Sequence, residues 1–183
     1  VMLYDLDADK GTLTPHTVPA LKLAPGSGPR HMTFSPDGRS LYVLNELLSS
    51  VTSYRFDPAA GTFQEIETLP LLPADFTGKN TSADIRIRPD GKFLYASNRG
   101  HDSITIFSID PATGKLSLVG HEPTQGKTPR NFTIDPTGKY LLVANQDSNS
   151  IVTFKIDPES GKLTATGQTT EVAAPVCLKF LEK

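Results

Sequence analysis

Three residues of this sequence stand out because a repeat makes their positions equivalent. Glu46, Arg99 and Gln146 each follow directly after an asparagine that recurs along the chain. A position with a purely structural task would be served by one residue type, so an acid, a base and an amide at equivalent places indicate a site. A carboxylate can act as general base on a water molecule, and an arginine can bind an anion or stabilise a developing oxyanion.

Three further residues precede strands that we expect to begin at the same edge of the fold. Arg30 and His31 come before the first of these strands, and Arg130 comes before the third. Arginine side chains bind carboxylate and phosphate groups in a bidentate manner. An ordinary set of surface salt bridges explains the same residues equally well. Positive charge close to Glu46 would also weaken this carboxylate as a base.

The recurring asparagines themselves, Asn45, Asn98 and Asn145, allow two interpretations. Asparagine commonly hydrogen-bonds the nearby backbone in a turn, and we favour this structural role. The alternative is contact with a ligand, which places Asn45 and Asn98 in the binding set. The predicted site therefore comprises the candidate catalytic residues Glu46, Arg99 and Arg30 and the candidate substrate-binding residues His31, Arg130, Gln146, Asn45 and Asn98.

Signals for other chemistry are weak. The sequence contains no Gly-x-Ser-x-Gly elbow, phosphate-binding loop or dinucleotide fingerprint. Asp102 and Asp147 fall in predicted turns, where solvation or backbone bonding is favoured over metal coordination. The single cysteine, Cys177, is interpreted as a buried structural thiol. We therefore expect no metal and no cofactor.

A repeat of blade length must position these residues. Its markers are Pro36-Asp37-Gly38, Pro89-Asp90-Gly91 and Pro136-Thr137-Gly138, which begin 53 and 47 residues apart. An asparagine follows each marker proline after nine residues, and an Asp-Pro-x-x-Gly turn begins after 21. These spacings are typical of the four-stranded blades of a β-propeller. A β-sandwich would not require such a recurrence.

Each repeat is predicted to form four short antiparallel strands. Apolar residues alternate with polar ones at Met32 and Phe34, which is the period of a strand. The Pro-Asp-Gly turn returns the chain through residues 41–43, and residues 51–56 form a third strand before the Asp-Pro-x-x-Gly turn. In this arrangement both turn types lie on one rim. The residues after the recurring asparagine share the other rim with the starts of the first strands.

The chain is therefore expected to be an all-β, partial propeller. Residues 1–27 are predicted to be the last two strands of one blade, 28–80, 81–127 and 128–174 to be complete blades, and 175–183 to be a lone first strand. Propellers close with roughly four to eight blades, and open sheet edges promote association. We expect the chain to be the C-terminal half of a larger protein, with its ring completed by the missing half or by another copy of the chain.

Composition narrows the range of partners and locations. With 18 Lys and Arg against 20 Asp and Glu, the net charge of −2 provides no basic field to attract nucleic acid or membranes. No apolar run approaches the roughly 20 residues that span a bilayer, and no secretory signal is recognisable. We expect a cytoplasmic protein whose partner is a small anionic molecule.

Four segments together resemble one known family. They are GPRHMTFSPDGRSLYVLNE (Gly28 to Glu46), PDGKFLYASNRGHDSI (Pro89 to Ile104), TPRNFTIDPTGKYLLVANQDSNSI (Thr128 to Ile151) and PVCLKF (Pro175 to Phe180). Together they resemble the seven-bladed β-propeller lactonase family, which contains 6-phosphogluconolactonase and the carboxymuconate lactonizing enzyme. The resemblance covers essentially the whole chain and implies a seven-bladed parent.

The resemblance also implies roles for individual residues. Arg30, Glu46 and Arg99 match the family's proposed catalytic and substrate-binding groups. The family's site includes a histidine on an earlier blade that has no counterpart here, so the fragment is expected to be inactive by itself. For the parent, the resemblance implies a hydrolase of carbohydrate metabolism that opens a sugar lactone such as 6-phosphogluconolactone, a step of the pentose phosphate pathway. The alternatives are a carboxymuconate cycloisomerase and a non-catalytic binding propeller.

Overall fold

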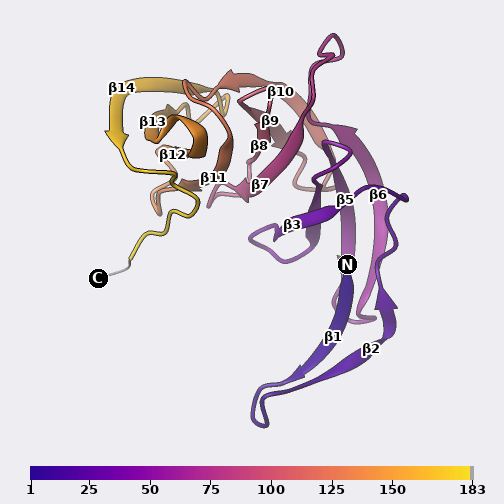
Figure 1. Cartoon of the computed structure of the whole chain (residues 1–183). Coiled ribbons are helices and arrows are strands. Elements are labelled where there is room, and N and C mark those ends of the chain that lie inside the picture. The colour runs from indigo at the N-terminus through magenta and orange to yellow at the C-terminus, as the bar shows by residue number, and fades with distance from the viewer. Residues whose placement is uncertain (182–183) are drawn as a thin grey trace.

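The computed structural model describes residues 1–181 as a chain of small twisted β-sheets that follow one another along a curve (Figure 1). A two-stranded sheet of β1 (Met2–Asp7) and β2 (Thr12–Ala20) comes first. Three four-stranded sheets follow, and the strand pairs in them are antiparallel. We call these sheets blades 1, 2 and 3 in chain order.

Within each blade the strands pair in the order in which they occur in the chain. Blade 1 contains β3 (Pro29–Phe34), β4 (Ser40–Asn45), β5 (Ser50–Asp57) and β6 (Thr62–Pro70). Blade 2 contains β7 (Thr81–Ile87), β8 (Phe93–Arg99), β9 (Ser103–Ile109) and β10 (Leu116–Pro123). Blade 3 contains β11 (Pro129–Ile134), β12 (Tyr140–Asn145), β13 (Ser150–Ile156) and β14 (Leu163–Glu171). The predicted fold, four-stranded antiparallel propeller blades, is confirmed.

One short 3-10 helix, η1 (Gln146–Ser148), connects β12 with β13. Within residues 1–181 no helix has the length and apolar character needed to cross a membrane.

The marker turns close the first hairpin of each blade through glycine. Gly38, Gly91 and Gly138 have φ angles of 70°, 76° and 70°, a left-handed conformation that glycine adopts without the steric cost of a Cβ atom. In blade 1, Asp37 Oδ1 accepts a hydrogen bond from the backbone N–H of Arg39 at 3.0 Å. The side chains of these turns are thus used to stabilise the turns themselves.

Apolar layers join each blade to the next. Tyr42 of blade 1 belongs to the same buried cluster as Phe107 of blade 2. Tyr95 of blade 2 belongs to a second cluster with Phe132 of blade 3. Burial of these large side chains is the main favourable contribution to the stacking of the blades.

A tyrosine at the same repeat position also makes a hydrogen bond across each layer. The hydroxyl of Tyr42 donates to the carbonyl oxygen of Gly114 at 3.0 Å, and that of Tyr95 donates to Gly161 O at 2.9 Å. Both acceptors are the glycines that close an Asp-Pro-x-x-Gly turn in the following blade. The polar tip of each buried tyrosine is therefore paired, and the pairing fixes neighbouring blades relative to each other.

The first strands of the three blades lie on the concave side of the curve, where β7 contacts both β3 and β11 (Figure 1). Each of these strands has an irregular register with its hairpin partner near its start. A β-bulge of this kind redirects side chains and is common beside functional sites. The shifts fall between Pro29 and His31, between Ser82 and Ile85, and between Pro129 and Asn131.

The C-terminal segment differs from the prediction. Residues 175–181 contain no strand, although a lone first strand was expected over 175–183; residues 182 and 183 lie outside the described part of the chain. A strand requires a hydrogen-bonded neighbour, and here the contact is a single one, from Leu178 N to Asn131 Oδ1 at 2.7 Å. Cys177, predicted to be buried, is exposed for the same reason, because the segment is not packed into a sheet.

Candidate functional site

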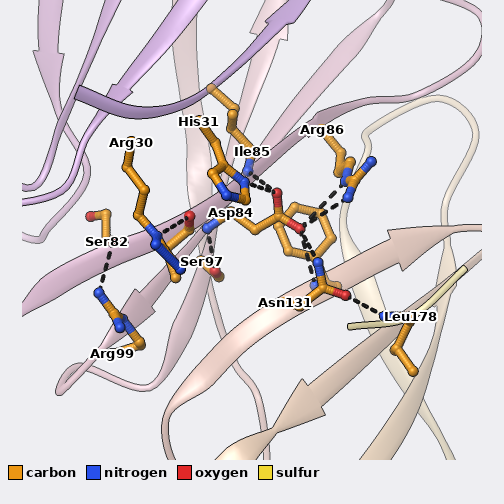
Figure 2. A network of polar contacts seen from close by, with 12 residues as sticks. Arg30, His31, Ser82, Asp84, Ile85, Arg86, Ser97, Arg99, Asn131 and Leu178 are labelled. Carbon is orange, nitrogen blue, oxygen red and sulfur yellow. Dashed lines mark hydrogen bonds and ion pairs between the residues drawn. The ribbon is translucent and has the colours of Figure 1, made fainter. Parts of the chain in front are cut away.

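The first residues of β7 form a strip to which three side chains from other strands are bound (Figure 2). The strip offers two backbone carbonyl groups and one carboxylate in consecutive residues. The contacts are Arg99 Nη2 to Ser82 O at 3.3 Å, Arg30 Nε to Ala83 O at 3.0 Å, and His31 Nδ1 to Asp84 Oδ1 at 2.9 Å. Because a strand rises about 3.3 Å per residue, the two guanidinium groups and the imidazole are anchored within about 7 Å along β7.

The bulge at the start of β3 explains why two neighbouring residues point the same way. In a regular strand, Arg30 and His31 would point to opposite faces. The register between β3 and β4 shifts between Pro29 and His31, and both side chains then reach β7 of the next blade. The bulge therefore adds a second functional group to the same side of the strand.

Glu46 and Arg99 are brought into direct contact across the boundary between blades 1 and 2. Arg99 Nη2 forms an ion pair and hydrogen bond with Glu46 Oε1. The side chain of Glu46 is 29% exposed and that of Arg99 is 14% exposed, so the pair is partly screened from water. The backbone of Glu46 is also fixed, since its carbonyl oxygen accepts a hydrogen bond from Ser82 N at 3.0 Å.

Asp84 lies at the centre of the polar network and was missed by the sequence analysis (Figure 2). It is 1% exposed, and a buried carboxylate requires donors to compensate for lost hydration. Its Oδ1 accepts from Ile85 N at 2.9 Å in addition to the contact with His31. Its Oδ2 accepts from Asn131 Nδ2 at 2.7 Å and from Arg86 Nη2 at 3.3 Å.

A signal that could have revealed Asp84 was present in the repeat. Counted from the marker prolines, His31, Asp84 and Asn131 occupy the same position in three successive blades. The structure joins them in that order, since Asp84 contacts both of the others. Three unlike polar residues at one repeat position form the same pattern as Glu46, Arg99 and Gln146.

The comparison with known families agrees with this architecture. The family described as "Lactonase, 7-bladed beta-propeller" matches residues 1–180. The chain belongs to this lactonase family. The match confirms the resemblance inferred from the sequence, including its assignment to propellers of seven blades.

Three similar proteins are described as lactonases. A 6-phosphogluconolactonase of Bacillus subtilis is 39% identical over 181 residues, 99% of this chain and 51% of that protein. One from Serratia proteamaculans is 42% identical over 132 residues, 72% of this chain and 39% of that protein. The structure of a periplasmic gluconolactonase from Pseudomonas aeruginosa superposes with a TM-score of 0.91 at 36% identity, over 98% of this chain and 50% of that one.

This chain thus spans about half the length of the Bacillus and Pseudomonas lactonases. Neither is described as a cycloisomerase or as a binding module, so those two alternatives are set aside.

The residues that the resemblance assigned to the lactonase site are close together in the structure. Glu46 contacts Arg99, and Arg99 and Arg30 bind adjacent carbonyl groups of Ser82 and Ala83. Arg130 and Gln146 form a separate pair in blade 3, with Arg130 Nη1 3.4 Å from Gln146 Oε1. Within residues 1–181 no hydrogen bond or ion pair joins this second pair to Glu46 or Arg99.

The substrate-binding role considered for Asn45 and Asn98 needs correction. Asn45 is 1% exposed and Asn98 is 0% exposed, so neither presents a surface to a ligand. Asn45 Nδ2 donates to the hydroxyls of Ser50 and Thr52, each at 3.0 Å. Asn98 Nδ2 donates to Thr105 Oγ1 at 2.8 Å. Both side chains connect neighbouring strands of their own blade, so their role is structural, but these partners are hydroxyl groups of the next strand and not the turn backbone that we expected.

Two of the pockets in the described structure concern the polar network and the turns. One of about 230 Å³ adjoins the polar network and is lined by Val1, Pro29, Arg30, His31, Met32 and Val43. Another, of about 180 Å³, lies among the Pro-Asp-Gly and Asp-Pro-x-x-Gly turns, where its polar groups hold the turns together. In the residues that the structure describes, no three His, Cys, Asp or Glu side chains are grouped so as to hold a metal ion.

Proposed function

We propose that the protein carrying this chain hydrolyses a sugar δ-lactone such as 6-phosphogluconolactone. The observation that supports this most directly is the contact between Glu46 and Arg99, with Arg30 anchored beside them on β7. A carboxylate and two guanidinium groups in one place match the needs of ester hydrolysis, which are an oriented water molecule and positive charge near the carbonyl oxygen. The names of the similar proteins point to the same substrate class.

The anchoring of Arg30 leaves its terminal nitrogens available. Its Nε is bound to Ala83 O, while within residues 1–181 neither Nη atom has a hydrogen-bond partner. A planar guanidinium fixed at one nitrogen presents its other two as a fork for an anionic group or a carbonyl oxygen. We assign Arg30 to substrate binding and carbonyl polarisation, Arg99 to holding Glu46 and stabilising negative charge, and Glu46 to orienting the attacking water.

Two further proposals concern how the ring of blades is completed and where in the cell the protein works. In the first sheet Met2, Leu6 and Leu13 are 60%, 66% and 62% exposed, an apolar surface suited to covering by a further blade. We propose that further blades, from the same polypeptide or from a second copy, cover it, and that the protein works in the cytoplasm. Light scattering and cell fractionation test these two statements.

The experiment on function measures release of acid from 6-phosphogluconolactone, corrected for spontaneous hydrolysis. It compares the 183-residue chain with a polypeptide that extends it to the length of its relatives. In the active form, Glu46→Gln and Arg99→Ala are each expected to lower kcat/KM by about 10²-fold or more. The matched controls are Glu65→Gln on β6 and Arg39→Ala in the first marker turn, both exposed. Unchanged rates in both site variants would exclude the proposed roles.

A further inference from the structure

We propose that Nε2 of His31 accepts the proton of the attacking water and that Asp84 is the positioning residue that holds His31 in the required tautomer. This inference rests on the proposed lactone hydrolysis and adds to it a proton acceptor beyond the residues assigned above. It is carried by the contact between His31 and Asp84 and by the place of that contact on β7.

The carboxylate of Asp84 is surrounded by hydrogen-bond donors. Apart from His31, every hydrogen-bond partner described for the oxygens of Asp84 is an N–H group. These donors are Ile85 N, Asn131 Nδ2, Phe132 N and the guanidinium group of Arg86. Both oxygens of Asp84 therefore act as acceptors.

The accepting carboxylate in turn determines where the imidazole carries its proton. His31 Nδ1 lies 2.9 Å from Asp84 Oδ1, and a contact with an acceptor-only carboxylate requires Nδ1 to be the donor. In the neutral ring, Nε2 then carries the lone pair. The His31 side chain is 43% exposed while that of Asp84 is 1% exposed. The Nδ1 edge of the imidazole is therefore bound to a buried carboxylate, and the Nε2 edge faces solvent.

The position of His31 places this free nitrogen within the proposed site. Its anchor on β7, Asp84, follows directly after Ala83, the anchor of Arg30. Arg30 and His31 also line the same pocket of about 230 Å³. A lactone whose carbonyl group is held by Arg30 therefore lies beside the imidazole. Glu46 Oε1, by contrast, is already engaged by Arg99, which suits it to orientation rather than proton transfer.

The proposed step is balanced without any further reactant. The water oxygen forms a bond to the lactone carbonyl carbon while one water proton moves to His31 Nε2. When the tetrahedral intermediate collapses, the bond between the acyl carbon and the ring oxygen breaks, and Nε2 returns the proton to that oxygen. The product is the open hydroxy acid, whose carboxyl proton passes to solvent, and His31 is again neutral.

The tautomer of His31 can be measured on the 183-residue chain, and this measurement does not require enzymatic activity. Long-range ¹H–¹⁵N NMR distinguishes a protonated from an unprotonated ring nitrogen, and the His31→Gln variant identifies the signals of His31 among those of the four histidines. We expect Nδ1 to be protonated and Nε2 unprotonated in the neutral ring, and we expect Asp84→Asn to yield a mixture of tautomers. If the neutral His31 of the unmodified chain carries its proton on Nε2, the proposal is wrong, whether or not Asp84→Asn folds.

Kinetics then separate proton transfer from simple substrate binding. In the active protein, His31→Gln is expected to lower kcat by about 10²-fold or more, with KM changed less than about threefold because binding is left to the arginines. Added imidazole is expected to restore part of the activity of His31→Ala. The exposed-turn variant Asp9→Asn and the β2 variant His16→Gln serve as controls.

The outcomes distinguish this proposal from the proposed function. If the unmodified active protein does not hydrolyse the lactone, the proposed function fails, while the tautomer measurement still stands on its own. If the unmodified protein is active and His31→Gln keeps its kcat, or changes KM alone, the role of His31 as proton acceptor is overturned and the lactonase function remains.

Discussion

Glu46 of blade 1 and Arg99 of blade 2 contact each other, although each is the residue that follows the same asparagine of the repeat. Equivalent positions in adjacent blades are brought together because the blades stack side by side around the inner strands. The repeat therefore produces a pair of opposite charges from one structural position, and the pair lies next to the start of β7.

This contact predicts that the two residues act as a unit. In an active protein, the double variant Glu46→Gln/Arg99→Ala is expected to be no slower than the slower of the two single variants, because either change already disrupts the pair. The measurement is a double-mutant cycle on kcat/KM. A double variant whose loss equals the product of the single losses would show that the residues act independently.

The buried position of Asp84 predicts a large effect on stability. Asp84→Ala removes the acceptor for Asn131 and for the backbone N–H groups of Ile85 and Phe132. Loss of one partner in a buried charged network costs about 3 kcal/mol or more. The free energy of unfolding, measured by urea titration, is expected to fall by that amount, whereas the exposed-turn variant Asp9→Ala is expected to change it by less than about 0.5 kcal/mol.

Gly100, directly after Arg99, is predicted to tolerate no side chain. Its φ is +117°, and a Cβ there would collide with the backbone carbonyl of Lys79. We expect Gly100→Ala to reduce stability by about 2 kcal/mol or more and to displace Arg99, so that kcat/KM falls as well. Gly120→Ala is the control, since a Cβ at Gly120 meets no atom within 4 Å and its φ is not in the left-handed region. Equal stability of the two variants would contradict this account.

The tyrosine hydrogen bonds between blades predict a smaller loss. Tyr42→Phe and Tyr95→Phe each leave a carbonyl group in the next blade without its donor, which is expected to cost about 1 kcal/mol. Tyr140→Phe, where the side chain is 42% exposed, is expected to have no measurable effect on the urea midpoint. A loss at Tyr140 as large as that at Tyr42 would argue against a role for the buried contacts.

Tyr42 also predicts how stability depends on alkaline pH. Burial raises the pKa of Tyr42 from 10.0 to about 12. Because the folded chain holds this proton more tightly than the unfolded chain, the stabilising contribution is complete below pH 10.0 and is lost as the pH rises toward about 12. Urea titrations over this range are expected to show a smaller decline in Tyr42→Phe than in the unmodified chain. An identical decline would assign the effect to other groups.

The parts of the fold that could be predicted are those that the repeat specifies locally. Asp-Pro-x-x-Gly turns, marker glycines and alternating apolar residues determine hairpins through short-range sterics and side-chain burial, and the observed strands follow that pattern. The meeting of Glu46 with Arg99 was predictable for the same reason, because equivalent positions in stacked blades share a rim. Residues 175–181 were expected to belong to a lone strand and contain none, since a strand depends on a neighbour that local sequence does not supply.

The sequence by itself determined the repeat, the blade and the rim on which the unlike polar residues gather, because turns and two-residue periodicity act over a few residues. Only the tertiary structure decided that Asp84 is buried with five donor groups around it, that a bulge turns both Arg30 and His31 toward β7, and that Asn45 and Asn98 are internal. Burial and hydrogen-bond partners depend on the stacking of one blade on the next, which joins residues about 50 positions apart in the chain.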